Sequence, residues 1–533
     1  MILFMSGILS ALPMMFPDLW FIAWFSVCPL FYFAAKKKTA GTIRKTKVPA
    51  YRYGLAFFAG FYGLLYYWFT CLYPMDFAGF DNMQSVAVII VCWIGMTALQ
   101  GAIFAFVPVL YRRLRCGKAY IDPFLAASLW VIFEWLQTQT WMGVPWGRLA
   151  LSQYKMLPMI QSASLLGSLF VSFIIALSNG FIAVAAERLF VKKRNIKKSA
   201  ACAGAAAVIF AVNLLYGTAS LALYSENNAT ELTAAVIQGN IASGDKWADD
   251  SVENSLKIYT DLTLKACGEY SPQLVVWPES VITTSVRHNK SVCGKISELA
   301  QSTGATLLVG AYDYVNNENA VGGYDRYNAI VAFYPDSSVG DKPYYKRHIV
   351  PFGEYLPSPW FFKTFIPVLA NMNVFKYDLS PGTEPNLIDS PWGKLGGLVC
   401  FDSIYHTLVR DSVREGAELL TLVTNDSWYR DSAAVWQHNG HAVLRAVENG
   451  RYVVRAANTG VSTVISPTGE ILTSLAPLTK GYTAAAVKML SGRTIYSYAG
   501  DTWIIACAAF VVVLVMYKIA RRITHGVKRN GKS

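Results

Sequence analysis

Residues 396–402 read Gly-Gly-Leu-Val-Cys-Phe-Asp, a small and apolar run that leads into a cysteine, an aromatic residue and an acid. This pattern predicts a buried strand that ends where the side chain of Cys400 can be presented to a loop. A cysteine in such a place is a candidate nucleophile. The alternative is a small core residue, since free cysteine is among the residue types most often buried.

Charge is distributed unevenly along the 533 residues. The net charge is +13, and 23 of the 47 lysines and arginines lie in four short segments, namely 35–53, 112–118, 188–198 and 518–533. Residues 225–495 instead contain 22 basic and 27 acidic residues. The basic excess therefore belongs to loops beside apolar runs, and it does not indicate nucleic-acid binding.

Eight apolar runs predict membrane-spanning helices, because a helix needs about 20 apolar residues to cross a hydrocarbon core of about 30 Å. The runs are 2–16, 18–34, 54–73, 85–111, 121–140, 157–186, 199–224 and 499–517. We interpret residues 1–34 as two spans joined at residues 16–18. A cleaved signal peptide would instead have a basic leading region and a small-residue cleavage site, and residues 1–34 show neither.

Basic loops mark the cytoplasmic side of a membrane protein. The four basic segments and both termini are then cytoplasmic, and residues 225–495 lie on the opposite side, between the seventh and eighth spans. The sequence thus predicts a transmembrane domain of about seven helices at 1–224, an exported domain at 225–495, and a final helix with a basic tail at 496–533.

One acid interrupts the apolar runs. Glu134 lies inside the fifth predicted span. An ionisable side chain at that depth is costly and usually faces a partner or a functional path. The alternative, which we favour, is a structural hydrogen bond to a neighbouring helix.

The segment 225–495 alternates β-rich runs with helical stretches, which predicts an α/β layered domain. The predicted strands are 233–238, 274–277, 305–311, 328–334, 395–400, 419–424, 452–456 and 462–465. The predicted helices are 251–267, 290–302, 404–415 and 433–449.

Residues 356–377 form an insertion that is too rich in proline for a span and too apolar for an ordinary exposed loop. In a domain tethered to a bilayer, such a loop can enter the interface or cover a lipid. Packing on the core of the domain itself is the equally weighted alternative.

An acid and a lysine precede Cys400, each where a strand gives way to a loop. Glu279 follows the apolar residues 275–277, and Lys346 follows two tyrosines. A nearby base or cation favours the reactive thiolate, whose unperturbed pKa is about 8.5. The set fits a nucleophilic site, and an ordinary ion pair of Glu279 with Lys346 is the structural alternative.

These stretches resemble the nitrilase, or carbon–nitrogen hydrolase, superfamily, and more closely its membrane-bound apolipoprotein N-acyltransferase family. The resemblance covers essentially the whole chain. Its motifs are 238–241 with Lys246 and Trp247, 277–279, 350–357, the cysteine stretch, 424–428 and 455–460. It implies a multi-pass helical membrane protein with an inserted nitrilase-like α-β-β-α sandwich.

The resemblance also implies residue roles. Glu279 would be the general base, Lys346 would stabilise the oxyanion, Cys400 would form the covalent intermediate, and Glu354 would support the site. The residues implied in substrate binding are Trp247, Phe401, Asp402 and Trp428. Phe401 and Asp402 stand where the family usually has tyrosine and glutamate.

The implied reaction moves a fatty acyl chain from a membrane phospholipid, through a thioester on Cys400, to the α-amino group of the N-terminal diacylglyceryl cysteine of an apolipoprotein. It is a ping-pong scheme that needs no cofactor and no metal. The implied location is the bacterial inner membrane, with the catalytic domain in the periplasm and both termini in the cytoplasm. We expect a monomer.

Two rival functions remain. In a membrane-tethered amidase or nitrilase, water would resolve the thioester, but a soluble substrate needs neither eight spans nor the apolar 356–377 loop. A non-catalytic lipid-binding or transport protein would keep its function in a Cys400→Ala variant, which the ordered set of Glu279, Lys346 and Cys400 argues against.

The remaining histidines and cysteines give weaker indications. His438 and His441 have helical spacing but no third ligand at a recognisable spacing, so we predict core or solvated side chains and no metal site. Cys267 and Cys293 could pair in an oxidising periplasm, which would leave Cys400 free.

Overall fold

The computed structural model describes residues 1–36, 49–75, 79–190, 195–226, 229–242, 250–320, 322–365, 367 and 378–530. Two compact units form. One consists of Met1–Tyr67, Val91–Leu223 and Ala499–Ser533, and the other of Trp68–Ile90 and Tyr224–Tyr498. The second unit thus includes Trp68–Ile90, which the sequence analysis assigned to the transmembrane domain.

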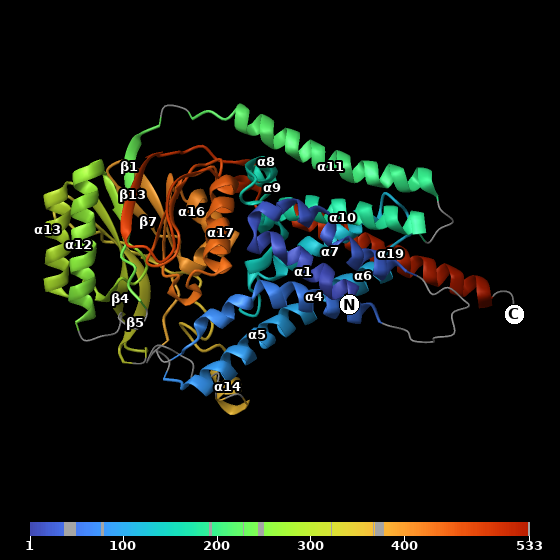
Figure 1. Cartoon of the computed structure of the whole chain (residues 1–533), viewed down its shortest axis with the longest axis horizontal. Helices are drawn as coiled ribbons and strands as arrows, with labels where there is room; N and C mark the ends of the chain where they lie inside the picture. The colour runs from blue at the N-terminus through green and yellow to red at the C-terminus, as the bar shows by residue number, and fades with distance from the viewer. Residues whose placement is uncertain are drawn as a thin grey trace. The chain divides into compact units, whose positions relative to one another are not determined.

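The first unit is helical (Figure 1). Its longer helices, including α5, which continues into it from the second unit, are α1 (Ile2–Met15), α3 (Cys28–Ala35), α4 (Ala50–Leu65), α5 (Asn82–Phe104), α6 (Phe106–Leu114), α7 (Asp122–Leu136), α10 (Ser168–Phe190), α11 (Ile196–Ala222) and α19 (Thr502–Asn530). Shorter helical pieces are η1 (Pro17–Ile22), α2 (Ala23–Ser26), η4 (Pro145–Gly147), η5 (Leu149–Gln153), α8 (Leu157–Ile160) and α9 (Ala163–Leu166). The turn η2 (Tyr67–Leu72) begins at Tyr67 of this unit and continues in the second unit.

Among the described residues, six helical stretches are long and apolar enough to cross a membrane, two fewer than predicted. They are Pro17–Ala35, Ala50–Leu72, Asn82–Leu114, Ser168–Phe190, Ile196–Ala222 and Thr502–Thr524. The predicted first and fifth spans are the helices α1 and α7, which have 14 and 15 residues. At a rise of 1.5 Å per residue these helices are about 21–23 Å long, shorter than the hydrocarbon core.

The sixth predicted span, 157–186, is also divided. Its first part forms α8 and α9, and a long helix begins only at Ser168, after Gly167 with a φ of +82°. That left-handed backbone conformation is open to glycine and ends a right-handed helix.

Glu134 on α7 is buried and makes structural hydrogen bonds. Its Oε1 accepts from the Trp130 indole over 2.8 Å and from the Leu149 backbone N–H over 2.9 Å. These bonds tie α7 to the η5 segment and fit the structural alternative that we favoured for this acid.

The second unit contains, within the described residues, two β-sheets. The strands of the first are β1 (Glu231–Gln238), β2 (Leu274–Val276), β3 (Ile282–Ser285), β4 (Thr306–Asn316), β5 (Tyr324–Phe333), β6 (Tyr344–Tyr345) and β13 (Gly481–Lys488). Their order is β13-β1-β2-β4-β5-β6, with β3 paired to β4.

The second sheet has the order β12-β11-β10-β9-β8-β7. Its strands are β7 (Leu387–Ser390), β8 (Gly393–Val399), β9 (Leu419–Thr424), β10 (Val453–Ala457), β11 (Ser462–Ile465) and β12 (Ile471–Leu475). Helical elements of this unit are α12 (Ser251–Tyr270), α13 (Lys290–Thr303), α14 (Pro359–Phe365), η7 (Cys400–Ile404), α16 (His406–Arg414), η8 (Ser427–Tyr429), α17 (Ala433–Asn449) and α18 (Ile495–Ala499).

Side-chain alternation along the strands builds the layers, because successive residues point to opposite faces of a sheet. On β4, Leu307 and Val309 pack in the core with α12 and α13, whereas Leu308 packs between the sheets against residues such as Val399 and Val423. Figure 1 shows α12 and α13 over one sheet and α16 and α17 over the other. The predicted α-β-β-α sandwich is confirmed.

Strand direction determines where a site can form. The pairs β1–β2 and β2–β4 are parallel, as are β8–β9 and β9–β10. The carboxyl ends of parallel strands lie at one edge of their sheet, where α/β proteins commonly bind ligands. Glu279 follows β2, and Cys400 follows β8.

Candidate active site

Cys400 is the first residue of the η7 turn that follows β8. Its φ is +48°, a left-handed conformation that is uncommon for a residue with a side chain. Two glycines in β8 permit close packing before this turn. A Cβ on Gly397 would lie 2.6 Å from the ring of Tyr344, and a Cβ on Gly396 would lie 2.9 Å from Ala417. Strand β8 can therefore approach the segment that carries Lys346.

Lys346 connects two carboxylates. Its ammonium lies 3.2 Å from Oε1 of Glu279 and 2.8 Å from Oε1 of Glu354, and all three side chains are buried. The amide of Asn328 on β5 donates to the same two oxygens, over 2.7 Å and 3.2 Å. The structure thus brings together three of the four residues assigned to catalysis. Asn328, which the sequence analysis did not identify, holds two of them.

The remaining oxygens of the two carboxylates are bound by the backbone. The Asn425 N–H donates to Oε2 of Glu279 over 2.8 Å, and the Val350 N–H donates to Oε2 of Glu354 over 2.7 Å. The chain passes closely behind Glu279, since a Cβ on Gly310 would lie 2.1 Å from the carbonyl oxygen of Pro278. Each carboxylate is therefore fixed in orientation.

Electrostatics keep the lysine charged and the thiol neutral. Burial alone would lower the pKa of Lys346, but Glu279, Glu354 and Cys400 raise it well above its usual 10.5. Desolvation and the charge of Glu279 raise the pKa of Cys400 well above 9, although Lys346 acts in the opposite direction. A nucleophilic thiol of this kind requires a base, and Glu279 is the charged group with the largest effect on the pKa of Cys400.

Asp402 holds the cysteine turn and the lysine segment together. Its carboxylate accepts from the backbone N–H of Val399 over 3.1 Å and of His348 over 2.7 Å, and from the hydroxyl of Tyr344 over 2.9 Å. Burial raises the pKa of Asp402 to about 6. The side chain is fully buried, so this geometry favours a positioning role over direct contact with a substrate.

The other residues assigned to substrate binding lie in different surroundings. Phe401 is mostly buried and contacts the rings of His348 and Tyr405, with centroids 5.9 Å and 5.7 Å apart. Trp428 lies in η8 and is partly exposed. Trp247 lies outside the described residues. Their roles in substrate binding stay predictions.

The sequence analysis missed the contacts that Asn328 and His438 make at the site. Asn328 lies inside a predicted strand and is part of no motif that we used, so the sequence offered no indication of its role. His438 was predicted to be a core or solvated residue. The structure buries it completely, with Nε2 3.2 Å from the carbonyl oxygen of Cys400.

The two cysteines of the suggested disulfide are free thiols, and both pack beside the core under α12 and α13. Within the described part of the chain, no group of three or more histidine, cysteine, aspartate or glutamate side chains is arranged to hold a metal ion.

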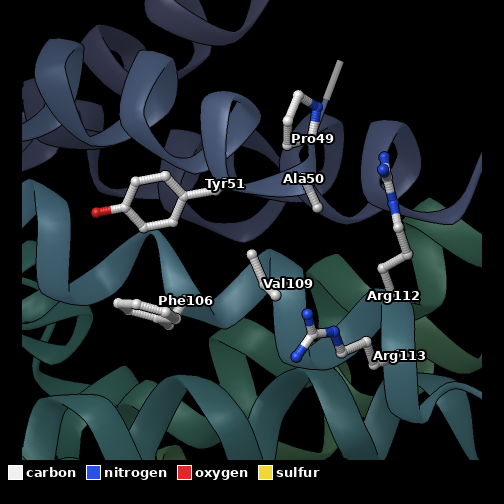
Figure 2. A pocket seen from close by; sticks show the side chains of 7 residues that line it. All are labelled: Pro49, Ala50, Tyr51, Phe106, Val109, Arg112 and Arg113. Carbon is white, nitrogen blue, oxygen red and sulfur yellow. The ribbon is translucent and has the colours of Figure 1, made fainter. Parts of the chain in front are cut away.

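A separate hollow lies in the helical unit (Figure 2). It has a volume of about 450 Å³ and is lined by Pro49, Ala50, Tyr51, Phe106, Val109, Arg112 and Arg113. It contains none of the residues assigned to catalysis.

Two family models match separate parts of this chain. The carbon-nitrogen hydrolase family matches residues 233–495, and the apolipoprotein N-acyltransferase N-terminal domain matches residues 6–181. Among solved structures, Nit3 of Saccharomyces cerevisiae, a member of branch 10 of the nitrilase superfamily, is 20% identical with a TM-score of 0.38, covering 52% of this chain and 96% of its own.

Full-length relatives extend the match. An apolipoprotein N-acyltransferase of Geobacter metallireducens is 30% identical over 522 residues, which cover 98% of this chain and 95% of the relative. One of Gloeobacter violaceus is 30% identical over 85% of this chain and 82% of its own length. One of Neisseria meningitidis serogroup B is 27% identical, with 88% of each chain covered. The chain therefore belongs to the apolipoprotein N-acyltransferase family.

Proposed function

We propose that this acyltransferase uses Glu279, Lys346 and Cys400 to transfer a fatty acyl chain from a phospholipid to the N-terminal amine of a diacylglyceryl apolipoprotein. The protein is a membrane protein that N-acylates lipoproteins, as its family does. The observation that supports the residue assignment best is the ammonium of Lys346 held between the buried carboxylates of Glu279 and Glu354.

The first half-reaction forms a thioester. The sulfur of Cys400 attacks the carbonyl carbon of the phospholipid ester while Glu279 accepts the thiol proton. The Lys346 ammonium stabilises the negative charge that develops on the carbonyl oxygen. The ester C–O bond then breaks, and Glu279 returns the proton to the departing alkoxide, which leaves as lysophospholipid.

In the second half-reaction the acceptor amine replaces the sulfur of Cys400 as the nucleophile. The free α-amine of the lipid-modified cysteine attacks the thioester carbonyl, and Glu279 accepts one proton from the nitrogen. The C–S bond breaks, an amide is formed, and the proton returns to the sulfur of Cys400. The two substrates occupy one site in turn, which is the condition for ping-pong kinetics.

Placement relative to the membrane follows the distribution of charge. The basic segments beside the apolar helices support cytoplasmic termini and a periplasmic catalytic unit, because basic loops stay in the cytoplasm. The exposed rings on α14 support a contact with lipid.

The test is intact-mass analysis of the purified protein and its Cys400→Ala variant after incubation with phospholipid alone. We expect a fatty-acyl adduct on the wild type only, which a diacylglyceryl peptide with a free amine then removes as an N-acyl product. Release of free fatty acid without an acceptor would instead indicate a hydrolase. Absence of both adduct and lysophospholipid would overturn the assignment of these residues.

A further inference from the structure

A second buried network touches Cys400 from the side of α17. Nε2 of His438 lies 3.2 Å from the carbonyl oxygen of Cys400 and 3.0 Å from Oγ of Ser403. The Ser403 hydroxyl donates to that same carbonyl oxygen over 2.7 Å. The carbonyl of the candidate nucleophile is thus contacted by two polar side chains.

The opposite edge of the imidazole is anchored. Nδ1 of His438 lies 2.9 Å from Oδ1 of Asp426, whose other oxygen lies 2.7 Å from the Arg455 guanidinium. All three side chains are fully buried. Although burial opposes it, Arg455 and His438 hold the pKa of Asp426 well below its usual range, so this carboxylate accepts hydrogen bonds and does not donate them.

Nδ1 of His438 therefore faces the carboxylate of Asp426 and, at 3.3 Å, the guanidinium of Arg455, whereas Nε2 faces the carbonyl oxygen of Cys400 and the hydroxyl of Ser403. The Thr424 hydroxyl also donates to Oδ1 of Asp426, over 2.9 Å, and helps to hold this carboxylate. The network thus contacts the nucleophile at its carbonyl oxygen.

The left-handed backbone conformation of Cys400 requires support from neighbouring groups. A φ of +48° is costly for a residue with a Cβ, and such conformations persist only where the surrounding structure holds them. Donors on the Cys400 carbonyl fix the plane of the next peptide bond, and with it the direction in which the Cα–Cβ bond points.

We propose that His438 is a positioning residue, which holds the carbonyl of Cys400 through Nε2 and so aims the sulfur at the acyl carbonyl of the substrate. This inference rests on the proposed role of Cys400 as the nucleophile. Asp426 and Arg455 serve the same end by fixing the imidazole, and Ser403 shares its target.

Two substitutions separate positioning from simple core stability. His438→Gln keeps an N–H near the position of Nε2 but loses the group at Nδ1, and His438→Asn does the reverse. We expect the asparagine variant to form the acyl-enzyme about tenfold more slowly with an unchanged KM for phospholipid, and the glutamine variant to stay within about threefold of the wild type. A residue needed only to pair Asp426 would give the opposite order.

The rate is measured by intact mass on the full chain, after thermal unfolding shows which variants are folded. Ser403→Ala removes the other donor from the same carbonyl and is expected to slow the same step, so it serves if His438→Asn does not fold. Thr463→Val is the matched control, because it removes a buried bond of 2.8 Å to the neighbouring Asn439 on α17 without contacting Cys400.

The outcomes are distinguishable from failure of the proposed function. If Cys400→Ala still transfers acyl chains, the nucleophile assignment falls and the inference falls with it. If Cys400→Ala is inactive while the glutamine and asparagine variants are equally slow, or while Ser403→Ala matches Thr463→Val, the inference alone is overturned.

Discussion

The hydroxyl of Tyr344 donates a hydrogen bond of 2.9 Å to the carboxylate of Asp402. Tyr344 lies two residues before Lys346, and Asp402 lies two residues after Cys400. Both side chains are fully buried. This bond therefore joins the segment that supplies the proposed oxyanion cation to the turn that supplies the proposed nucleophile.

Removal of that bond tests its part in the alignment of the site. We expect Tyr344→Phe to lower the free energy of unfolding by about 1–2 kcal/mol and to slow acyl-enzyme formation, because a buried acceptor loses a donor. The control is Tyr345→Phe, whose hydroxyl donates over 2.9 Å to Asp313 instead. Equal loss of activity in both variants would contradict a specific role of the Tyr344 bond.

The raised pKa of Asp402 predicts that the rate of acyl-enzyme formation depends on pH. Its pKa is raised by burial to about 6, so below that pH the carboxyl becomes protonated and has fewer acceptor positions for Tyr344, His348 and Val399. We expect acyl-enzyme formation to fall between about pH 7 and about pH 5, and Asp402→Asn to be slow without this step.

Protonation of Asp402 is expected to change the free energy of unfolding in the opposite direction to the activity. A carboxyl with a raised pKa binds its proton more tightly in the folded protein, so its contribution to stability increases as the pH falls from about 6 toward the ordinary value of 3.8. Loss of activity over this range should therefore occur without unfolding attributable to Asp402. A thermal unfolding series over the same pH values checks the distinction.

Glu279→Gln is expected to separate thiol reactivity from catalysis. The charge of Glu279 raises the pKa of Cys400, so its removal should lower that pKa and speed alkylation by iodoacetamide at neutral pH. Acyl transfer should nevertheless be lost, because no base remains to accept the thiol proton. Slower alkylation in this variant would contradict the electrostatic argument. Lys346→Met is expected to slow alkylation, since it removes the charge that lowers the pKa.

Exposed rings on α14 predict a lipid contact. Trp360, Phe361 and Phe365 are 73%, 44% and 61% exposed, whereas Phe362 is buried against Phe352. We expect Phe361→Glu and Phe365→Glu to raise the KM for phospholipid and to leave alkylation of Cys400 unchanged. Leu264→Glu, at a similarly exposed position on α12, is the control. An unchanged KM would favour the alternative of packing on the domain itself.

Reporter fusions test the proposed orientation. A reporter that works only in the periplasm should be active when it is fused after Ser225. A reporter that works only in the cytoplasm should be active when it is fused after Lys518, because the basic segments remain in the cytoplasm. The reverse pattern would contradict the proposed placement of the catalytic unit.

The sequence was informative wherever local pattern determines structure. The predicted strands at 419–424 and 462–465 and the predicted helix at 433–449 coincide with β9, β11 and α17. Their β-branched and apolar runs, or their helical periodicity, do not depend on distant partners. The two-residue strand β6 was missed, because two residues give no period and the strand forms only through pairing with β5.

Membrane-helix bounds were less predictable for a related reason. Hydropathy identified apolar runs, but the end of a helix depends on backbone conformation, as at Gly167, and on tertiary packing around residues such as Glu134. The predicted count of eight spans thus includes two helices, α1 and α7, that are shorter than the bilayer core.

The sequence by itself determined the fold class, the family and the order of Glu279, Lys346 and Cys400, since these follow from patterns and motifs that are local in the chain. Only the tertiary structure decided what surrounds them. Asn328 reaches Glu279 across 49 positions, and His438 reaches Cys400 across 38. Such contacts depend on strand order and on how α17 packs on its sheet, and those arrangements arise from long-range pairing that no local pattern records.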